Sequence, residues 1–271
     1  MKSVFFIPAN NRKFITKARE IEANYLVLDL EDAIHENQLE KSIRNIIEHD
    51  VDKTAWIRIP FTEVPLNNFE PLLKAGFTKF MLPKIRQEKE LTDLLAYFNK
   101  ISKSSPELML LIENPLAVLN LHTLLKSTNV SGICFGSHDY CMNMEMKHTL
   151  ENLYWVRMNM LNHAKAMNKF AIDIASMELS DQIAFERECV DGFNKGFDAK
   201  LIVHPWQLSI LNNMSFYSDR DIEEAVDVKA YIDQIGGVDH FTIYKGKHRI
   251  IEKPHLKRIR KILQYHRYES F

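Results

Sequence analysis

Glycine is scarce in this chain, at 8 of 271 residues, where an average protein has about 7%. None of the eight forms the G-x-G-x-x-G pattern of a Rossmann dinucleotide site or the G-x-x-x-x-G-K pattern of a P-loop. Both patterns need glycine because the backbone must approach phosphate groups closely. The sequence therefore excludes these two nucleotide-binding sites.

Cysteine is also rare, and the three cysteines, Cys134, Cys141 and Cys189, include no C-x-x-C pair. An odd number without a disulfide framework is typical of a reducing compartment, so we expect buried thiols. The N-terminal apolar run stops at Pro8 and is too short for a signal peptide. These features predict a cytoplasmic protein.

Long apolar runs and an excess of one charge are missing as well. No apolar stretch reaches the roughly 18 residues that a membrane-spanning helix needs. The 35 basic and 36 acidic residues give a net charge of −1, so no overall field would attract nucleic acid or anionic lipid. Hydrophobic residues make up 46% of the chain, which is enough for a large core and excludes disorder.

Short apolar runs recur along the chain at regular intervals. Their hydrophobicity is continuous rather than alternating, which is typical of parallel strands buried on both faces. Segments with helical spacing of apolar residues lie between them, for example 66–75, 116–126, 149–167 and 180–195. The eight runs are 4–8, 25–30, 55–59, 79–84, 108–113, 132–136, 170–174 and 201–205.

Eight strands that alternate with helices predict an α/β protein with a (β/α)8 TIM barrel, because parallel strands need right-handed crossovers and eight strands close into a ring. A doubly wound open sheet is the alternative. The chain is longer than a barrel requires, so we expect a catalytic barrel over 1–215 and a C-terminal helical extension over 216–271. The extension contains a helix at 218–234, an irregular or hairpin-like segment at 237–252 and a basic amphipathic helix at 254–267.

Carboxylates follow several of the predicted strands, at the barrel end where active sites are found. Glu113 and Asp139 are about one βα unit apart, so they should end adjacent strands. Two carboxylates with room for water and substrate oxygens are the hard ligands that Mg²⁺ prefers. Glu31 and Asp32 could orient metal-bound water, or simply cap the loop that follows.

Basic residues also follow predicted strands. Arg58 should face a carboxylate or an anionic substrate, because an unpaired guanidinium would be costly there; Asp29 or Glu31 could serve as a structural partner. Lys84 could form a Schiff base if its pKa were lowered. His138 and His204 are either a general base or ligand, or hydrogen-bonded structural groups.

The segments VFFIPANNRKFITKA, YLVLDLEDAI, WIRIP, FMLPKI, LLIEN, ICFGSHDY, AIDI and LIVHPWQL together resemble one family, in its order and spacing. This is the HpcH/HpaI aldolase and citrate lyase superfamily, in its citrate lyase β-subunit branch. The resemblance implies a Mg²⁺-dependent TIM barrel that cleaves or forms a carbon–carbon bond. It assigns Glu113 and Asp139 as metal ligands and Arg58 as the arginine that holds the anionic end of the substrate.

Three positions depart from the family pattern. The usual P-G-x-R-P turn is replaced by residues 8–12, where Pro8 and Asn10 are candidate substrate-binding residues together with Lys84. Pro60 stands where the family has asparagine. In related enzymes the aspartate of an I-D-x-P segment enters the active site of the adjacent subunit, and Glu252 occupies the matching place here.

The sequence thus predicts a Mg²⁺-dependent carbon–carbon lyase or aldolase. Its substrate would be a β-hydroxyacyl thioester of the citryl-CoA or malyl-CoA type, on coenzyme A or a carrier, or a hydroxy or oxo acid. Arg58, Glu31, Asp32 and Glu252 are the candidate catalytic residues. We expect a homo-oligomer, because the helix at 254–267 must bury Leu256, Ile259 and Leu263, and the resemblance implies a homotrimer. A ligand-binding barrel without activity and a Schiff-base aldolase that uses Lys84 are the alternatives.

Overall fold

The structure is a computed structural model that describes residues 1–271 except 33, 35, 50, 238–240, 245–248 and 266–271. The chain divides into two compact units, Met1–Met214 and Ser215–Phe271. No helix in the described part of the chain is both long enough and apolar enough to cross a bilayer. The cysteines Cys134, Cys141 and Cys189 are buried free thiols.

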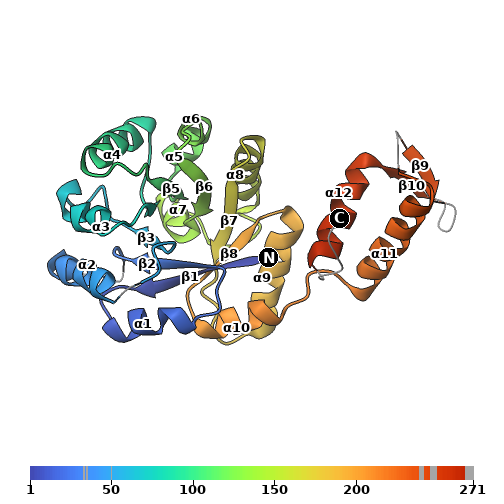
Figure 1. Ribbon diagram of the computed structural model, residues 1–271, viewed down its shortest axis with the longest axis horizontal. Helices are drawn as coiled ribbons and strands as arrows, with labels where there is room; N and C mark the ends of the chain where they lie inside the picture. Colours follow the sequence, from blue (N-terminus) through green and yellow to red (C-terminus); the bar gives the residue numbers. More distant parts are fainter. Residues whose placement is uncertain (33, 35, 50, 238–240, 245–248, 266–271) are drawn as a thin grey trace. The chain divides into compact units, whose positions relative to one another are not determined.

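The first unit is a closed barrel of eight parallel strands in sequence order, so the predicted TIM barrel is confirmed and the open sheet is wrong (Figure 1). Each strand overlaps its predicted apolar run. The ring closes where β1 pairs with β8, with Val4 opposite Leu201. The strands are β1 (Lys2–Pro8), β2 (Tyr25–Asp29), β3 (Trp56–Arg58), β4 (Lys79–Leu82), β5 (Glu107–Ile112), β6 (Val130–Phe135), β7 (Phe170–Ala175) and β8 (Ala199–Ile202).

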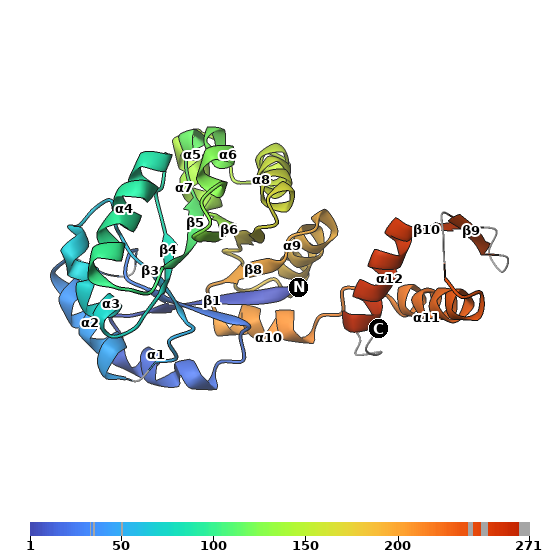
Figure 2. The same ribbon diagram turned by 45° about the horizontal axis from the view of Figure 1, so that its top comes forward.

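Helices surround this ring, as the turned view in Figure 2 shows. They are α1 (Arg12–Lys17), α2 (Leu39–Glu48), α3 (Glu70–Lys74), α4 (Glu88–Ile101), α5 (Pro115–Leu119), α6 (Leu121–Leu125), α7 (Ser137–Asn143), α8 (Tyr154–Ala166), α9 (Gln182–Lys195) and α10 (Pro205–Asn213). Three short 3-10 helices, η1 (Ala18–Glu20), η2 (Glu36–Gln38) and η3 (Leu66–Phe69), lie among them. Asn11 rather than Asn10 caps α1, since its side chain accepts the Lys13 N–H at 3.0 Å.

The barrel interior is filled by apolar side chains from all eight strands. They form one buried cluster of Val4, Val27, Trp56, Met81, Met109, Leu111, Cys134, Ile172, Ala199 and Leu201. Successive residues of a strand point to opposite faces, so the neighbours of these residues pack outward against the helices. This arrangement leaves the residues at the carboxyl ends of the strands to form the mouth of the barrel.

The second unit consists of α11 (Asp219–Gln234), a two-stranded antiparallel sheet of β9 (Phe241–Tyr244) and β10 (Arg249–Glu252), and α12 (Lys253–Tyr265). Ser218 begins α11 with a capping box, in which its Oγ accepts the Asp221 N–H. The core of this unit contains Ala225, Ile262 and Leu263.

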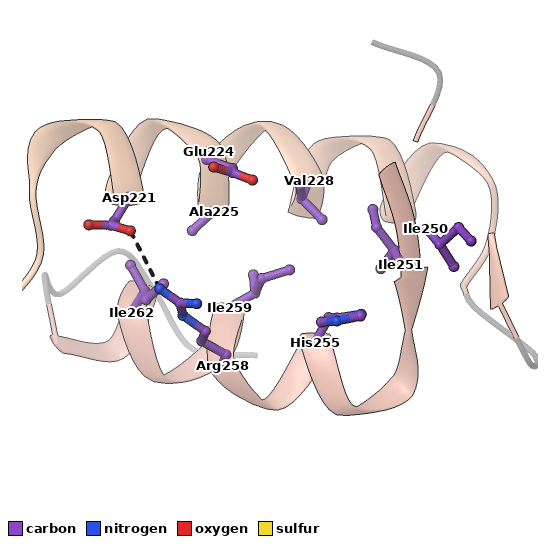
Figure 3. A pocket seen from close by; sticks show the side chains of 10 residues that line it. All are labelled: Asp221, Glu224, Ala225, Val228, Ile250, Ile251, His255, Arg258, Ile259 and Ile262. Atoms are coloured by element: carbon purple, nitrogen blue, oxygen red, sulfur yellow. Dashed lines mark ion pairs between the residues drawn. The ribbon is translucent and has the colours of Figure 1, made fainter. Parts of the chain in front are cut away.

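Figure 3 shows the groove between the two helices of this unit, about 390 Å³ in volume, with an ion pair of 3.5 Å between Asp221 and Arg258. Ile259 packs against the core of the unit, and Leu263 is buried in it. The apolar residues of α12 thus pack in part against α11, and an open groove remains between the two helices. Packing of this extension on a neighbouring subunit and the homotrimer both stay predictions.

Candidate active site at the barrel mouth

A cavity of about 270 Å³ lies at the carboxyl ends of the barrel strands. Several predicted site residues meet on its wall: Pro8, Asp32, Arg58, Glu113 and Asp139. Leu111, Met177 and Val203 contribute apolar surface. Strand order and parallel direction explain the meeting, because residues that end separate strands converge at one rim.

Arg58 at the end of β3 is the central cation of this site. Its Nε and one terminal nitrogen donate to the two oxygens of Asp29, each at 2.6 Å. The other terminal nitrogen lies 3.0 Å from Glu31 and 2.9 Å from Asp32. Burial alone would lower the pKa of Arg58, but the hydrogen bonds and charge of Asp29, followed by the other two carboxylates, raise it above its ordinary value. The guanidinium therefore stays charged and faces carboxylates of the protein.

The three carboxylates around Arg58 differ in exposure. The Asp29 and Glu31 side chains are 7% and 3% exposed, while that of Asp32 is 62% exposed. Both carboxylate oxygens of Glu31 lack hydrogen-bond geometry to any donor although two cations lie within ion-pair distance. Burial raises the pKa of Glu31 to about 7, against the lowering effect of Arg58. Two buried carboxylates, Asp29 and Glu31, and the exposed carboxylate of Asp32 therefore all contact the guanidinium.

Glu113, which follows β5, is the most buried acid on the cavity wall, at 3% exposure. Its Oε2 accepts the backbone N–H of Lys84 at 2.8 Å. Burial, with the nearby charge of Glu31 and a smaller effect of Asp139, raises its pKa to about 8, and the Lys84 N–H only partly offsets this. A Cβ at Gly136 would lie 2.3 Å from Cγ of Glu113, so glycine is required there.

Asp139 lies in the first turn of α7, a short helix that the sequence did not predict. Asn143 from the same helix donates to the backbone oxygens of Glu113 at 3.2 Å and Asp139 at 2.8 Å. This bridge holds the two predicted metal ligands at one edge of the cavity.

The mouth has an excess of negative charge. Among its described residues, six carboxylates lie around two cations, namely Asp29, Glu31, Asp32, Glu63, Glu113 and Asp139 around Arg58 and Lys84. No cluster of three or more His, Cys, Asp or Glu side chains in the described part of the chain is arranged to hold a metal ion. The carboxylate oxygens on the cavity wall are donors of the kind that Mg²⁺ prefers.

Lys84 follows β4 and adopts a left-handed backbone conformation, with φ of 54°. Its ammonium contacts Glu63 and lies 3.1 Å from Glu31. Burial lowers the pKa of Lys84, but the hydrogen bond to Glu63 and the charge of Glu31 outweigh it and raise the pKa above its ordinary value. This environment opposes the lowered pKa that a Schiff-base lysine needs.

Other predicted residues have different surroundings. Pro8 lines the cavity and Asn10 does not. Glu252 belongs to the second unit, where it is the last residue of β10 and is exposed. Its backbone N–H donates to His255 Nδ1 at 2.9 Å. His204 caps α10 by accepting the Trp206 N–H, which is the structural role.

The sequence missed a cluster beside Asp139. The His138 ring lines the cavity and stacks on His148 with ring centroids 4.1 Å apart, and His148 Nε2 lies 2.8 Å from Oγ of the buried Ser137. Burial, with the charge of His138, lowers the pKa of His148. The sequence S-H-D directly after a predicted strand was a signal for Ser137 and His138. His148 lies in the loop after α7 and had no comparable signal.

The barrel has clear relatives. Citrate lyase subunit beta from Haemophilus influenzae is 22% identical over 240 residues, covering 83% of this chain and 82% of that protein. Mitochondrial citramalyl-CoA lyase from Homo sapiens is 24% identical, covering 84% of this chain and 75% of that protein.

Solved structures share the fold. The crystal structure of protein CitE from Mycobacterium tuberculosis, in complex with magnesium, acetoacetate and coenzyme A, superimposes with a TM-score of 0.83 at 19% identity and covers 97% of each chain. Residues 2–205, which include all eight barrel strands, match the family model described as HpcH/HpaI aldolase/citrate lyase. The chain therefore belongs to the HpcH/HpaI aldolase/citrate lyase family.

Proposed function

We propose that this protein is a Mg²⁺-dependent carbon–carbon lyase that acts on a β-hydroxyacyl thioester of coenzyme A. The observation that carries the proposal is the buried Glu113 beside Asp139 in a cavity that also presents Arg58. Metal ligands and an anion-binding arginine on one wall are what a substrate with a carboxylate next to a hydroxyl requires.

Glu113 and Asp139 would hold the magnesium ion. Their fit follows from the charge deficit of the mouth and from the raised pKa of Glu113, which a divalent cation would lower by stabilising the carboxylate. When bound, Mg²⁺ supplies a Lewis acid for the oxygens of the reacting carbon centre. The Lys84 N–H holds the Glu113 carboxylate, and Asn143 links the backbone carbonyls of Glu113 and Asp139.

Arg58 would bind the substrate carboxylate through the nitrogen that now faces Asp32. Asp32 is the most exposed of its three partners, so this contact is the easiest to exchange. Asp29 would keep its two hydrogen bonds and so orient the guanidinium plane toward the cavity. Because Arg58 remains charged, the contact would be a charge-assisted pair in a partly dry site.

Cleavage moves one proton and one electron pair. The substrate hydroxyl loses its proton and becomes a carbonyl. The carbon–carbon bond breaks, and its electrons pass to the carbon next to the thioester carbonyl, which forms an enolate. That enolate then takes a proton at carbon, which gives a 2-oxo acid and a shorter acyl thioester. We propose Glu252 of a second copy as the proton-transfer group, because its carboxylate is exposed at the end of β10.

The names of the relatives support the thioester. Citramalyl-CoA lyase from Homo sapiens and (3S)-malyl-CoA thioesterase from Cereibacter sphaeroides both act on coenzyme A thioesters by their names, and the CitE crystal structure contains coenzyme A. A cytoplasmic location remains part of this proposal. The Schiff-base alternative loses support because Lys84 is held as an ammonium by Glu63 and Glu31.

The test is an assay of the purified protein with citryl-CoA, malyl-CoA and citramalyl-CoA, in which the released 2-oxo acid is measured. We expect turnover with Mg²⁺, loss with EDTA and recovery when Mg²⁺ is restored. Treatment with borohydride in the presence of a 2-oxo acid should leave activity unchanged. Release of free coenzyme A without a 2-oxo acid would indicate a thioesterase instead, and no turnover of any of the three would favour the ligand-binding alternative.

A further inference from the structure

A second cavity, of about 210 Å³, opens at the amino ends of the strands, at the other end of the barrel from the mouth. Three aromatic residues and three polar residues define it. Tyr25, Trp56 and Phe170 are the first residues of β2, β3 and β7, and Lys79 and Glu107 are the first residues of β4 and β5. The third polar residue is Ser131, the second residue of β6.

All three aromatic side chains line the cavity. The Tyr25 and Phe170 rings meet edge to face with centroids 5.6 Å apart, and Trp56 is 5% exposed. The small side chain of Ser131 faces these rings on the same lining. A cavity of roughly 150 Å³ with apolar walls accepts benzene, so this one has room for one ring and a small substituent.

Charge decides what kind of ring the cavity would accept. Three aromatic rings form a favourable site for a cation, but lysines already occupy that role. Nζ of Lys2 lies 5.4 Å from the Tyr25 centroid and 5.7 Å from the Phe170 centroid, and Nζ of Lys79 lies 5.6 Å from the Trp56 centroid. Both ammonium groups would repel a cationic guest and attract an anion, while Glu107 on the same lining offsets part of the charge of Lys79.

Polar contacts for an anion lie on one side of the cavity. The Lys79 side chain is 29% exposed and contacts Glu107 at 3.4 Å, which is longer than a hydrogen bond. Ser131 Oγ donates to the Leu108 carbonyl at 3.2 Å and lies on the same lining. Lys79 can therefore turn from Glu107 to a bound carboxylate without losing a buried partner.

The floor of this cavity separates it from the active site. Met81, Met109 and Ile172 line it and belong to the packed cluster inside the barrel, and the two cavities share no lining residue. We propose that the lower cavity binds a small monocyclic aromatic carboxylate, with its ring among Tyr25, Trp56 and Phe170 and its carboxylate at Lys79. This site does not depend on the proposed lyase activity.

The experiment is a titration of the full-length, isotope-labelled protein followed by NMR, with benzoate as the anionic probe and tetramethylammonium as the cationic one. The Trp56 indole N–H, assigned by comparison with Trp56→Phe, reports on the lower cavity, and the Gly136 amide reports on the mouth. We expect benzoate to shift the Trp56 signal in a saturable way and tetramethylammonium to leave it in place. Benzoate shifts confined to Gly136, or equal shifts of Trp56 by both probes, would overturn the proposal.

Two variants and a matched control complete the test. Ser131→Leu fills the cavity and should abolish the Trp56 shift, and its melting temperature shows whether the barrel is intact. Lys79→Met removes only the ammonium and should weaken benzoate binding about three- to tenfold, as expected for a partly exposed charge. Lys53→Met removes a lysine that lies over Phe77, outside the cavity, and should bind benzoate like the wild type. Unchanged binding by folded Ser131→Leu, or by Lys79→Met, would contradict the assignment.

Discussion

The backbone N–H of Lys84 donates a 2.8 Å hydrogen bond to Oε2 of Glu113, and Lys84 is in the left-handed region, with φ of 54°. A side-chain-bearing residue pays conformational strain of about 1 kcal/mol or more there. The contribution of Lys84 to the site is thus partly through its backbone, since this conformation turns its amide toward the buried carboxylate. Its ammonium meanwhile forms ion pairs with Glu31 and Glu63.

Removal of either proposed metal ligand should abolish Mg²⁺ binding. Glu113→Gln and Asp139→Asn each keep the side-chain shape but remove the anionic oxygen that a hard cation requires. We expect no measurable Mg²⁺ affinity by calorimetry, with circular dichroism unchanged. Wild-type affinity in both variants would show that the ion binds elsewhere.

Gly136→Ala should weaken Mg²⁺ binding although it replaces neither of the proposed metal ligands. The new Cβ would lie 2.3 Å from Cγ and 2.9 Å from Oε1 of Glu113, so that side chain must move. We expect at least a tenfold rise in the Mg²⁺ dissociation constant, about 1.4 kcal/mol. The control is Gly76→Ala, where a Cβ meets open space but φ is 89°; it should lose about 1 kcal/mol of stability with unchanged Mg²⁺ affinity.

Arg58→Lys should lower activity, because an ammonium group cannot replace the planar guanidinium. A lysine cannot contact Asp29 with two parallel hydrogen bonds and also present a nitrogen to substrate. We expect kcat/KM to fall by the equivalent of about 2–5 kcal/mol. Arg44→Lys is the matched control, because Arg44 forms an exposed helix pair with Glu40 and its replacement should leave kcat/KM unchanged. Full turnover by Arg58→Lys would remove Arg58 from the mechanism.

Glu252 can be tested by mixing two inactive chains. If Glu252→Gln and Asp139→Asn proteins are dissociated and reassembled together, a fraction of the sites should contain one intact set of groups and recover part of the activity. Recovery requires that Glu252 act on a site of another copy. A Glu252→Gln protein with wild-type turnover would mean that this glutamate has no catalytic role.

Acid stability should depend on Asp191, which pairs with Arg157 and Lys195. Burial raises its pKa, but the hydrogen bonds from Lys195 and Arg157 outweigh this and lower the pKa below its ordinary value. Its stabilising contribution is therefore complete above the unfolded-state pKa of about 3.9 and disappears as the pH falls through the lower native value.

Asp191→Asn should accordingly reduce the unfolding free energy at pH 6 by about 0.5–1 kcal/mol, allowing for solvent screening, and the difference from wild type should shrink below pH 3.9. Urea unfolding at several pH values measures this. Asp93→Asn removes an exposed carboxylate paired with Lys89 and should show little change. A pH-independent difference for Asp191→Asn would exclude the ion pair as its cause.

The strands were predictable because continuous apolar runs are required when both faces of a strand are covered. Helix boundaries were less so: the expected helix at 116–126 is interrupted at Asn120, and the one at 149–167 begins only at Tyr154. Short turns of this kind depend on contacts with the rest of the fold rather than on local periodicity.

When a strand is apolar on both faces, its sequence does not indicate which face a polar residue occupies. Asp173 lies inside the predicted strand 170–174, where its neighbour Ile172 points into the barrel and Asp173 points outward. It forms a fully buried ion pair with Arg157, with Nη2 to Oδ2 at 2.7 Å. Glu113 and Arg58 could be found because Glu113 directly follows β5 and Arg58 is the last residue of β3, where the strand reaches the mouth of the barrel.

The closed barrel also determines where foreign strands can attach. Each of its eight strands is paired on both sides, so the first unit exposes no strand edge to another chain. In the described part of the molecule, unpaired edges belong to β9 and β10 alone. Strand addition by an extended peptide, or the first step of β-type aggregation, would therefore begin on this hairpin and leave the barrel intact.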